Sequence, residues 1–215
     1  VIFLYGNAQL EKELEFLQTN YLSEFNKHDI TEKIIFGNQV NSFKKIESTY
    51  AINPKDSTDE KTFLALGIPV STADNEEEIL ALKILGEILF SSDASPFKLE
   101  FHNSYIGKDI EGGLLDQNHQ IIMFAEVIGS EPEKIDDFIN LFKSSMNKII
   151  KSGLNNDLKL SELNGFEFHN REDSCNSQRG LNYGMKIIKA NKLGEDPFEG
   201  LKFDQLFDSV RNKIL

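Results

Sequence analysis

The chain has 215 residues and a formal net charge of −12, from 35 acidic and 23 basic residues. The length suffices for one large hydrophobic core, and the excess of acid argues against nucleic acid as a partner, because phosphate binding needs clustered lysine and arginine. No apolar run approaches the roughly 20 residues that span a bilayer, and the single cysteine, Cys175, excludes an internal disulfide and a cysteine-rich zinc site.

The N-terminal part begins with a short β-prone run, VIFLY at residues 1–5, which ends at the turn signal Gly6–Asn7. Apolar residues then recur at helical spacing. They predict an amphipathic helix from about residue 8 to residue 27, carrying Leu10, Leu14, Leu17, Tyr21 and Phe25.

The next stretch, residues 29–60, is polar and irregular, with one strand expected at 43–51 and a turn at 53–56. Residues 63–70 alternate apolar and small side chains, which predicts a strand. One face of that strand holds Leu64, Leu66, Ile68 and Val70.

An unusually apolar helix is expected to follow this strand. Asp74 or Asn75 can cap it, and the acidic residues 76–78 suit the positive end of the helix dipole. The helix continues to about Phe90 and is apolar nearly all round. Such a pattern predicts burial on several sides.

The stretch LFSSDASPFKLEFHNSYIG then predicts a tight helical hairpin. Small polar residues at 91–94 break the first helix; Ser95 is expected to cap a second one, with Pro96 in its first position, where a missing N–H costs nothing. Three aromatic residues share one face at helical spacing. They are Phe97, Phe101 and Tyr105, and Gly107 is expected to end this second helix.

The clearest strand is IIMFAEVI at residues 121–128, which is apolar enough to be central in a sheet. Before it, Gly112–Gly113 is expected to be a flexible loop, since the spacing of a phosphate-binding loop is absent. After it, residues 130–133 match a capping box, and the helix that they open is expected to close at Gly153.

The remaining residues predict helices only. One covers about 155–173 with an interruption at Gly165, one covers 179–192, and one starts at Asp196–Pro197. The whole order predicts an α/β (α+β) fold: a two-layer sandwich of a mixed, largely antiparallel sheet and helices, with a helical C-terminal extension.

No catalytic and no metal-binding residue can be assigned from the residues themselves. Zinc hydrolases hold at least two histidine or carboxylate ligands on one rigid face, and no two histidines here have that spacing. They are His28, His102, His119 and His169. Cys175 has no adjacent histidine and no G-x-S-x-G motif occurs, so an enzyme centred on this thiol is a third hypothesis.

The segment SPFKLEFHNSYIG resembles the presequence protease and falcilysin branch of the insulinase/pitrilysin zinc metallopeptidases. Ser95, Pro96, Phe97, Ser104 and Gly107 match the pattern of that branch, whereas Tyr105 and Ile106 replace its usual Gly-Leu pair. The resemblance continues, in the same order, along residues 5–17, 128–157 and 179–207.

The resemblance implies that the chain is a piece of a longer protein, which fits its start without methionine and its end inside a helical pattern. Residues 1–7 would end the preceding catalytic domain, and 8–28 would be a linker helix. Residues 29–175 would form a non-catalytic metallopeptidase-like α/β domain, and 176–215 a helical extension towards a mid-chain hairpin.

The resemblance also implies a function for the parent protein. Zinc would be bound by an H-x-x-E-H motif in the preceding domain, so this chain would be an inactive part of the wall of a chamber that degrades short unfolded peptides without ATP. Its expected partners are those peptides, the catalytic domain and the C-terminal half of the same chain. The compartment would be cytoplasmic in a bacterium and an organellar lumen in a eukaryote.

Within that picture the candidate site residues form a structural motif and not a catalytic one. They are Ser95, Pro96, Phe97, Phe101, Tyr105 and Gly107. The alternative is an inactive structural or peptide-binding member of the same fold, whose parent has lost the zinc motif and has no peptidase activity.

Overall fold

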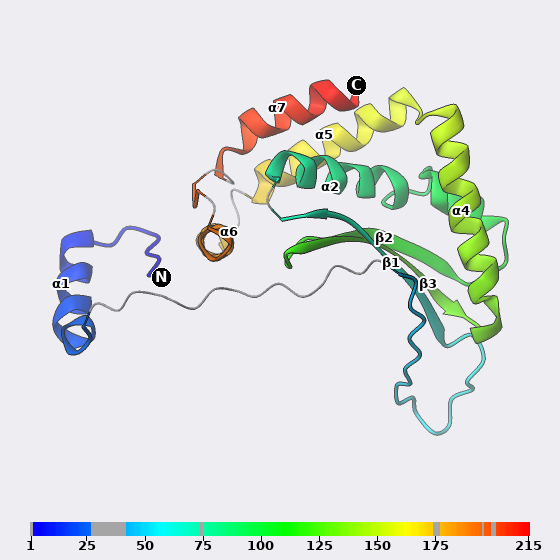
Figure 1. Ribbon diagram of the computed structural model, residues 1–215, viewed down its shortest axis with the longest axis horizontal. Coiled ribbons are helices and arrows are strands. Elements are labelled where there is room, and N and C mark those ends of the chain that lie inside the picture. The colour runs from blue at the N-terminus through cyan, green and yellow to red at the C-terminus, as the bar shows by residue number, and fades with distance from the viewer. Residues whose placement is uncertain (1, 27–41, 74, 174–176, 195, 199–200) are drawn as a thin grey trace. The chain divides into compact units, whose positions relative to one another are not determined.

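The structure is a computed structural model that describes residues 2–26, 42–73, 75–173, 177–194, 196–198 and 201–215 (Figure 1). Within them lie seven α-helices and one three-stranded antiparallel sheet, which confirms the α+β class with a helical C-terminal part. None of the described helices is long and apolar enough to cross a membrane.

The chain divides into two compact units. Unit 1 contains Val1–Gly37 and Arg171–Lys202, and unit 2 contains Asn38–Asn170 and Phe203–Leu215. Because unit 2 is built from two separate stretches, the chain leaves it near the end of helix α5, Asn156–Asp173, and returns to it for helix α7, Phe203–Ile214.

The helices of unit 1 are α1, Leu10–Asn20, and α6, Arg179–Leu193, with a 3₁₀ turn at Leu22–Glu24. The helix predicted over 8–27 therefore exists but is shorter. It ends because the backbone of Tyr21, at φ −133° and ψ −57°, leaves the helical region.

The β-prone run at the N-terminus is not a strand, so that prediction is wrong. A strand needs a partner strand for its backbone hydrogen bonds, and none of the described residues of unit 1 is in a strand. Phe3 and Tyr5 pack instead on the glycines of α6. A Cβ at Gly180 would lie 2.2 Å from the Tyr5 ring, and one at Gly184 would lie 2.8 Å from the Phe3 ring.

The first described residues of unit 2, 42–61, contain no strand, so the strand predicted over 43–51 is also wrong. Phe43 and Ile46 are exposed there, without the flanking strand that would cover them. The turn at 53–56 is confirmed, because the Asp56 N–H donates to the Asn53 carbonyl at 2.9 Å.

The sheet has the order β1-β3-β2 and is antiparallel throughout. Its strands are β1, Thr62–Thr72, β2, Asp109–Leu115, and β3, Gln120–Ser130. The strand predicted over 63–70 and the central strand predicted over 121–128 are both confirmed.

Strand β2 replaces the flexible loop expected at Gly112–Gly113, and that expectation is wrong. Glycine is a poor strand former, but close packing requires it here. A Cβ at Gly112 would lie 2.6 Å from the ring of Phe90, and a Cβ at Gly86 would lie 3.3 Å from the Cα of Gly113. The glycines let helix α2 approach the strand closely.

One side of the sheet is covered by helices: α2, Glu76–Phe90, α3, Pro96–His102, and α4, Ile135–Ser152. Asn75 caps α2, since its side chain accepts from the Glu78 N–H at 3.0 Å, whereas Asp74 lies outside the described residues. The predicted burial of α2 on several sides is confirmed, because it contributes to two cores.

The first core lies between these helices and the sheet, and the second joins α2 to α5, Asn156–Asp173, and α7, Phe203–Ile214. In Figure 1, α2, α5 and α7 lie on the same side of the sheet. The second core is built from Leu80, Ile84, Ile88, Leu163, Phe207 and Val210.

The capping box predicted at 130–133 is wrong. The Ser130 hydroxyl is buried and donates to the Ile106 carbonyl at 2.6 Å, so it ties β3 to the segment before β2 instead of capping a helix. A 3₁₀ turn, Pro132–Lys134, leads into α4. The predicted closure of α4 at Gly153 is confirmed by the positive φ of 73° there.

Two predicted boundaries near the C-terminus differ from the structure. Helix α5 passes through Gly165 without interruption, and α7 begins at Phe203 rather than at Asp196–Pro197. The Asp196 carboxylate accepts from the Phe198 N–H at 2.9 Å, a local bond that favours a turn at this point over a helix start.

Candidate functional site

No zinc-binding donor set is present among the residues that the structure describes, where no group of three or more histidine, cysteine, aspartate or glutamate side chains comes together. His102 and His169 are exposed on different helices, α3 and α5. His28 and Cys175 lie outside the described residues.

Ser95 and Pro96 stand at the start of α3, and Pro96 takes the first helical position as predicted. Ser95 occupies the N-cap position of α3 as predicted, but its buried hydroxyl makes no bond to that helix. It accepts from the Ser92 N–H at 3.0 Å and lies 3.2 Å from the Ser92 hydroxyl. Ser95 therefore fixes the turn that reverses the chain between α2 and α3.

The aromatic residues of α3 connect three helices. Phe97 is fully buried, its ring centroid lying 4.8 Å from that of Phe90 on α2 and 4.9 Å from that of Phe142 on α4. Phe101, one turn further along, is buried in the same core. The hairpin of α2 and α3 packed by aromatic rings is as the sequence predicts.

Tyr105 does not belong to this aromatic face, contrary to the prediction. Helix α3 ends at His102, and Ser104 donates both its N–H and its hydroxyl to the Phe101 carbonyl, which turns the chain away. Tyr105 follows with a positive φ of 55° and 88% of its surface exposed.

Gly107 lies just before β2 rather than at a helix end. A Cβ there would lie 2.4 Å from Cγ1 of Val127 and 3.1 Å from the Ile128 carbonyl oxygen. The position therefore needs glycine for close approach to β3, and the next residue, Lys108, donates its N–H to the same Ile128 carbonyl.

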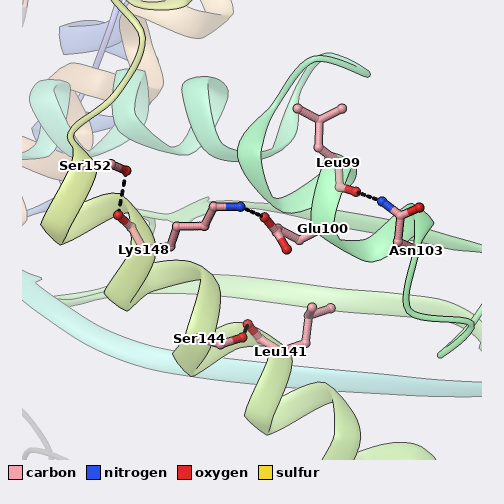
Figure 2. A network of polar contacts seen from close by, with 7 residues as sticks. All are labelled: Leu99, Glu100, Asn103, Leu141, Ser144, Lys148 and Ser152. Atoms are coloured by element: carbon pink, nitrogen blue, oxygen red, sulfur yellow. Dashed lines mark hydrogen bonds and ion pairs between the residues drawn. The ribbon is translucent and has the colours of Figure 1, made fainter.

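A polar network joins the outer surfaces of α3 and α4 (Figure 2). The Lys148 ammonium of α4 pairs with the Glu100 carboxylate of α3. On either side, the hydroxyls of Ser144 and Ser152 donate to backbone carbonyls of α4, and the Asn103 amide donates to the Leu99 carbonyl.

A shallow depression of about 530 Å³ lies on this surface, lined by Ser144, Asn147, Lys148, Lys151 and Ser152. Lys148 and both serines already bond within the chain. The depression therefore presents few groups for a ligand, and we interpret the network as a fastening between two helices.

Two carboxylates on α2 have shifted pKa values. Desolvation by neighbouring atoms raises the pKa of Glu87, and the Glu162 carboxylate of α5 raises it further, against a smaller opposing effect of His169. Hydrogen bonds from Lys213 and Ser209 of α7 lower the pKa of Glu77. Among the described residues, neither carboxylate lies near a second group with a matched pKa shift, as an acid–base pair would require.

The second face of the sheet carries no helix of unit 2 and was not singled out by the sequence. Alternation along each strand assigns the outward residues, and the register places them in rows across β1, β3 and β2. We call this surface the uncovered face; its rows are Ala65–Glu126–Glu111, Gly67–Phe124–Gly113 and Pro69–Ile122–Leu115.

The uncovered face is apolar in the middle and acidic at one end. Phe124 is half-buried, with its ring against Gly113, where a Cβ would lie 3.5 Å from the ring. Glu126 and Glu111 stand directly opposite each other on neighbouring strands. Phe63, half-exposed beside this acidic end, meets the ring of Tyr50 edge-on at 5.7 Å.

Comparison with known proteins gives the chain its relatives. The family described as peptidase M16 inactive domain matches residues 1–158. Protein HypA of Clostridium perfringens is 27% identical over 214 residues, covering 99% of this chain and 22% of its own length. Presequence protease 1 of Arabidopsis thaliana, a chloroplast and mitochondrial protein, is 27% identical over 137 residues, covering 63% of this chain and 13% of its own length.

Among solved structures, a protease from Helicobacter pylori superposes with a TM-score of 0.60 at 14% identity, covering 95% of this chain and 50% of that one. This likeness shows a shared fold. The chain spans about a fifth or less of the length of the two curated relatives named above.

Proposed function

The chain belongs to the family of peptidase M16 inactive domains, and from this premise we propose that it forms part of the chamber wall of a zinc metalloendopeptidase that degrades short unfolded peptides. The family match over residues 1–158 carries the proposal. The parent protein would supply the zinc ligands from another domain, and this chain would supply support and part of the surface that meets the peptide.

The architecture of unit 2 supports a wall. The sheet is backed on one side by two packed cores, whereas its other face carries no helix of the unit. A rigid backing behind an open surface is what a site assembled from several domains needs. In this proposal the segment from Ser95 to Gly107 is a structural element that fixes α2, α3 and α4 against the sheet.

The boundaries predicted from the resemblance belong to the same proposal. Residues 1–7 would end the catalytic domain, 8–28 would link it to the present domain, 29–175 would be that domain, and 176–215 would lead towards the second half of the protein.

The test compares the full-length parent protein with the isolated chain. Both are incubated with a short unfolded peptide and, as a control, with a stably folded protein. We expect the parent to cleave the peptide only, a zinc chelator to abolish that cleavage, and the isolated chain to cleave neither substrate.

A parent that binds the peptide but never cleaves it would contradict the peptidase proposal and favour the inactive structural or peptide-binding alternative. Cleavage by the isolated chain that thiol alkylation abolishes would instead assign the activity to Cys175.

A further inference from the structure

The uncovered face combines three properties. It is made by three hydrogen-bonded strands, so its shape is fixed. Its middle rows hold exposed or half-exposed apolar and small residues. Its end row holds two carboxylates. We propose that this face is a docking surface for an extended peptide that carries lysine or arginine beside apolar side chains.

The acidic row, with Glu111 and Glu126, indicates that the partner is cationic. Like charges directly opposite each other on neighbouring strands destabilise a sheet, and Glu111 and Glu126 are paired in this way. Neither forms an ion pair with the described lysine, arginine and histidine residues. A cation placed between them by a partner would replace this repulsion with attraction to both carboxylates.

The surroundings of that row suit a long basic side chain. Ala65, the third member of the row, is exposed and has no side chain long enough to cover its neighbours. The half-exposed ring of Phe63 lies two residues before Ala65 on the same side of β1. Lysine and arginine combine an apolar stem with a charged head, so the stem can pack on the ring while the head meets the carboxylates.

The apolar rows select an extended chain that runs along the strand direction, so that it passes from one row to the next. Side chains in an extended peptide alternate, so every second one faces the surface that the peptide lies on. Phe124 and Leu115 offer apolar area in the rows next to the acidic one. A peptide with a basic residue followed at intervals of two by apolar residues would match this order of rows.

This inference rests on the proposed function, because a peptide is the partner that the family context supplies. It adds where the peptide binds, which is the uncovered face of β1, β3 and β2. It also adds which peptides bind best, namely those that combine basic and apolar residues. The overall excess of acid in the chain acts in the same direction by attracting cationic peptides from solution.

The experiment measures peptide binding to the full-length protein by fluorescence anisotropy, with a zinc chelator present so that the proposed peptidase does not consume the probe. The probe is a fluorescein-labelled peptide with the sequence Lys-Ser-Leu-Ser-Leu, which places one lysine and two leucines on the same side of an extended chain, and in its matched control glutamate replaces the lysine. We expect the lysine peptide to bind at least about tenfold more tightly, with an advantage that shrinks at high salt.

The decisive variant is the pair Glu111→Gln and Glu126→Gln, which removes both charges and keeps the side-chain shape. We expect it to weaken binding of the lysine peptide by about tenfold. The matched control, Glu133→Gln with Asp136→Asn, removes the same charge from exposed positions in the 3₁₀ turn before α4 and in its first turn. It should change binding by less than about twofold. Leu115→Ser should weaken binding of both peptides, because it removes apolar contact.

Three results would overturn the proposal: equal binding of the two peptides, equal losses in the two charge variants, or binding that neither Glu111→Gln/Glu126→Gln nor Leu115→Ser alters. Self-association that Leu115→Ser abolishes, without peptide binding, would assign the face to a second copy of the chain. Circular dichroism checks that each variant is folded.

The binding experiment can fail without the proposed peptidase function failing, and the converse also holds. Cleavage of peptides without the chelator, together with binding that ignores these variants, would keep the peptidase and remove the docking surface. Peptide binding that weakens in Glu111→Gln/Glu126→Gln and in Leu115→Ser, with no cleavage under any condition, would keep the docking surface and remove the peptidase.

Discussion

The two faces of the sheet are made by alternate residues of the same three strands, yet they follow different rules. On the covered face, Ile110, Ala125 and Val127 are fully or almost fully buried, and glycine appears where a helix must come close. On the uncovered face, the same strands place Phe124 half-exposed and two glutamates opposite each other. Folding stability accounts for the residues of the covered face. It does not account for the opposed glutamates of the uncovered face, whereas a cationic partner bound there would.

The largest expected difference between the two faces is in stability, and removing one aromatic ring from each face tests it. Phe97→Ala should lower the free energy of unfolding by about 3–5 kcal/mol, because Phe97 is fully buried between Phe90 and Phe142. Phe124→Ala should cost about 1–2 kcal/mol, since that ring is only half-buried. Urea unfolding measures both, and equal costs would mean that the uncovered face is part of the core.

Adjacent glycines of β2 give a finer contrast. Gly112→Ala should destabilise the chain by about 1–3 kcal/mol, because the new Cβ would lie 2.6 Å from the Phe90 ring, which is itself stacked on Phe97. Gly113→Ala should stay within about 0.5 kcal/mol, because its Cβ meets Phe124 at an ordinary 3.5 Å. Thermal unfolding measures the destabilisation in both variants. A larger loss for Gly113→Ala than for Gly112→Ala would show that Gly113, and not Gly112, faces helix α2.

A charge reversal tests whether the uncovered face is shaped for stability. Glu111→Lys should raise the free energy of unfolding by up to about 1 kcal/mol, because it turns a like-charged cross-strand pair into an opposite-charged one. The gain should fade at high salt. Glu133→Lys, an exposed control outside the sheet, should show no such gain. A destabilised Glu111→Lys would mean that Glu111 already has a favourable role within the fold.

The smallest effect concerns Glu87, a partly desolvated carboxylate inside the helical layer. The pKa of Glu87 is raised above its ordinary 4.5, so between 4.5 and that raised pKa the folded state binds more protons than the unfolded state. Stability contributed by this group therefore falls as pH rises through that window. Glu87→Gln should be more stable than the parent chain at neutral pH by a few tenths of a kcal/mol.

Urea midpoints measured at neutral pH and below pH 4.5 test this, because protonated Glu87 resembles glutamine and the difference should vanish at the lower pH. A difference that persists in acid would show that the amide gains by a hydrogen bond and not by loss of charge.

Most helices, and the strands β1 and β3, were predictable because their patterns are local. Asn75 with its acidic first turn, the apolar run to Phe90 and the glycine at 153 each act within one element. β2 was missed because its glycines are explained only by Phe90 and by Gly86, which lie far from it in sequence. The strand predicted at 43–51 is absent because a local β-prone pattern is not sufficient. The segment has no neighbouring strand to pair with among the described residues.

The candidate site was less predictable than the fold. The motif at Ser95 correctly placed a turn and a buried aromatic helix, but it extended the aromatic face to Tyr105, where the backbone has already left the helix. The uncovered face was not predictable at all. Alternation in a strand says that two faces exist, and only the packing of helices elsewhere in the chain decides which of them is covered.

The return of the chain to unit 2 gives α7 a particular position. Its buried Phe207 and Val210 complete the second core, yet the preceding Arg171–Lys202 belongs to the other unit. In terms of association, α7 is a ligand for α2 and α5 whose local concentration is set by the connecting chain. A single proteolytic cut between 171 and 202 would convert α7 into a dissociable peptide. The second core would then lose Phe207 and Val210 when the cut protein is diluted, because α7 would dissociate at low concentration.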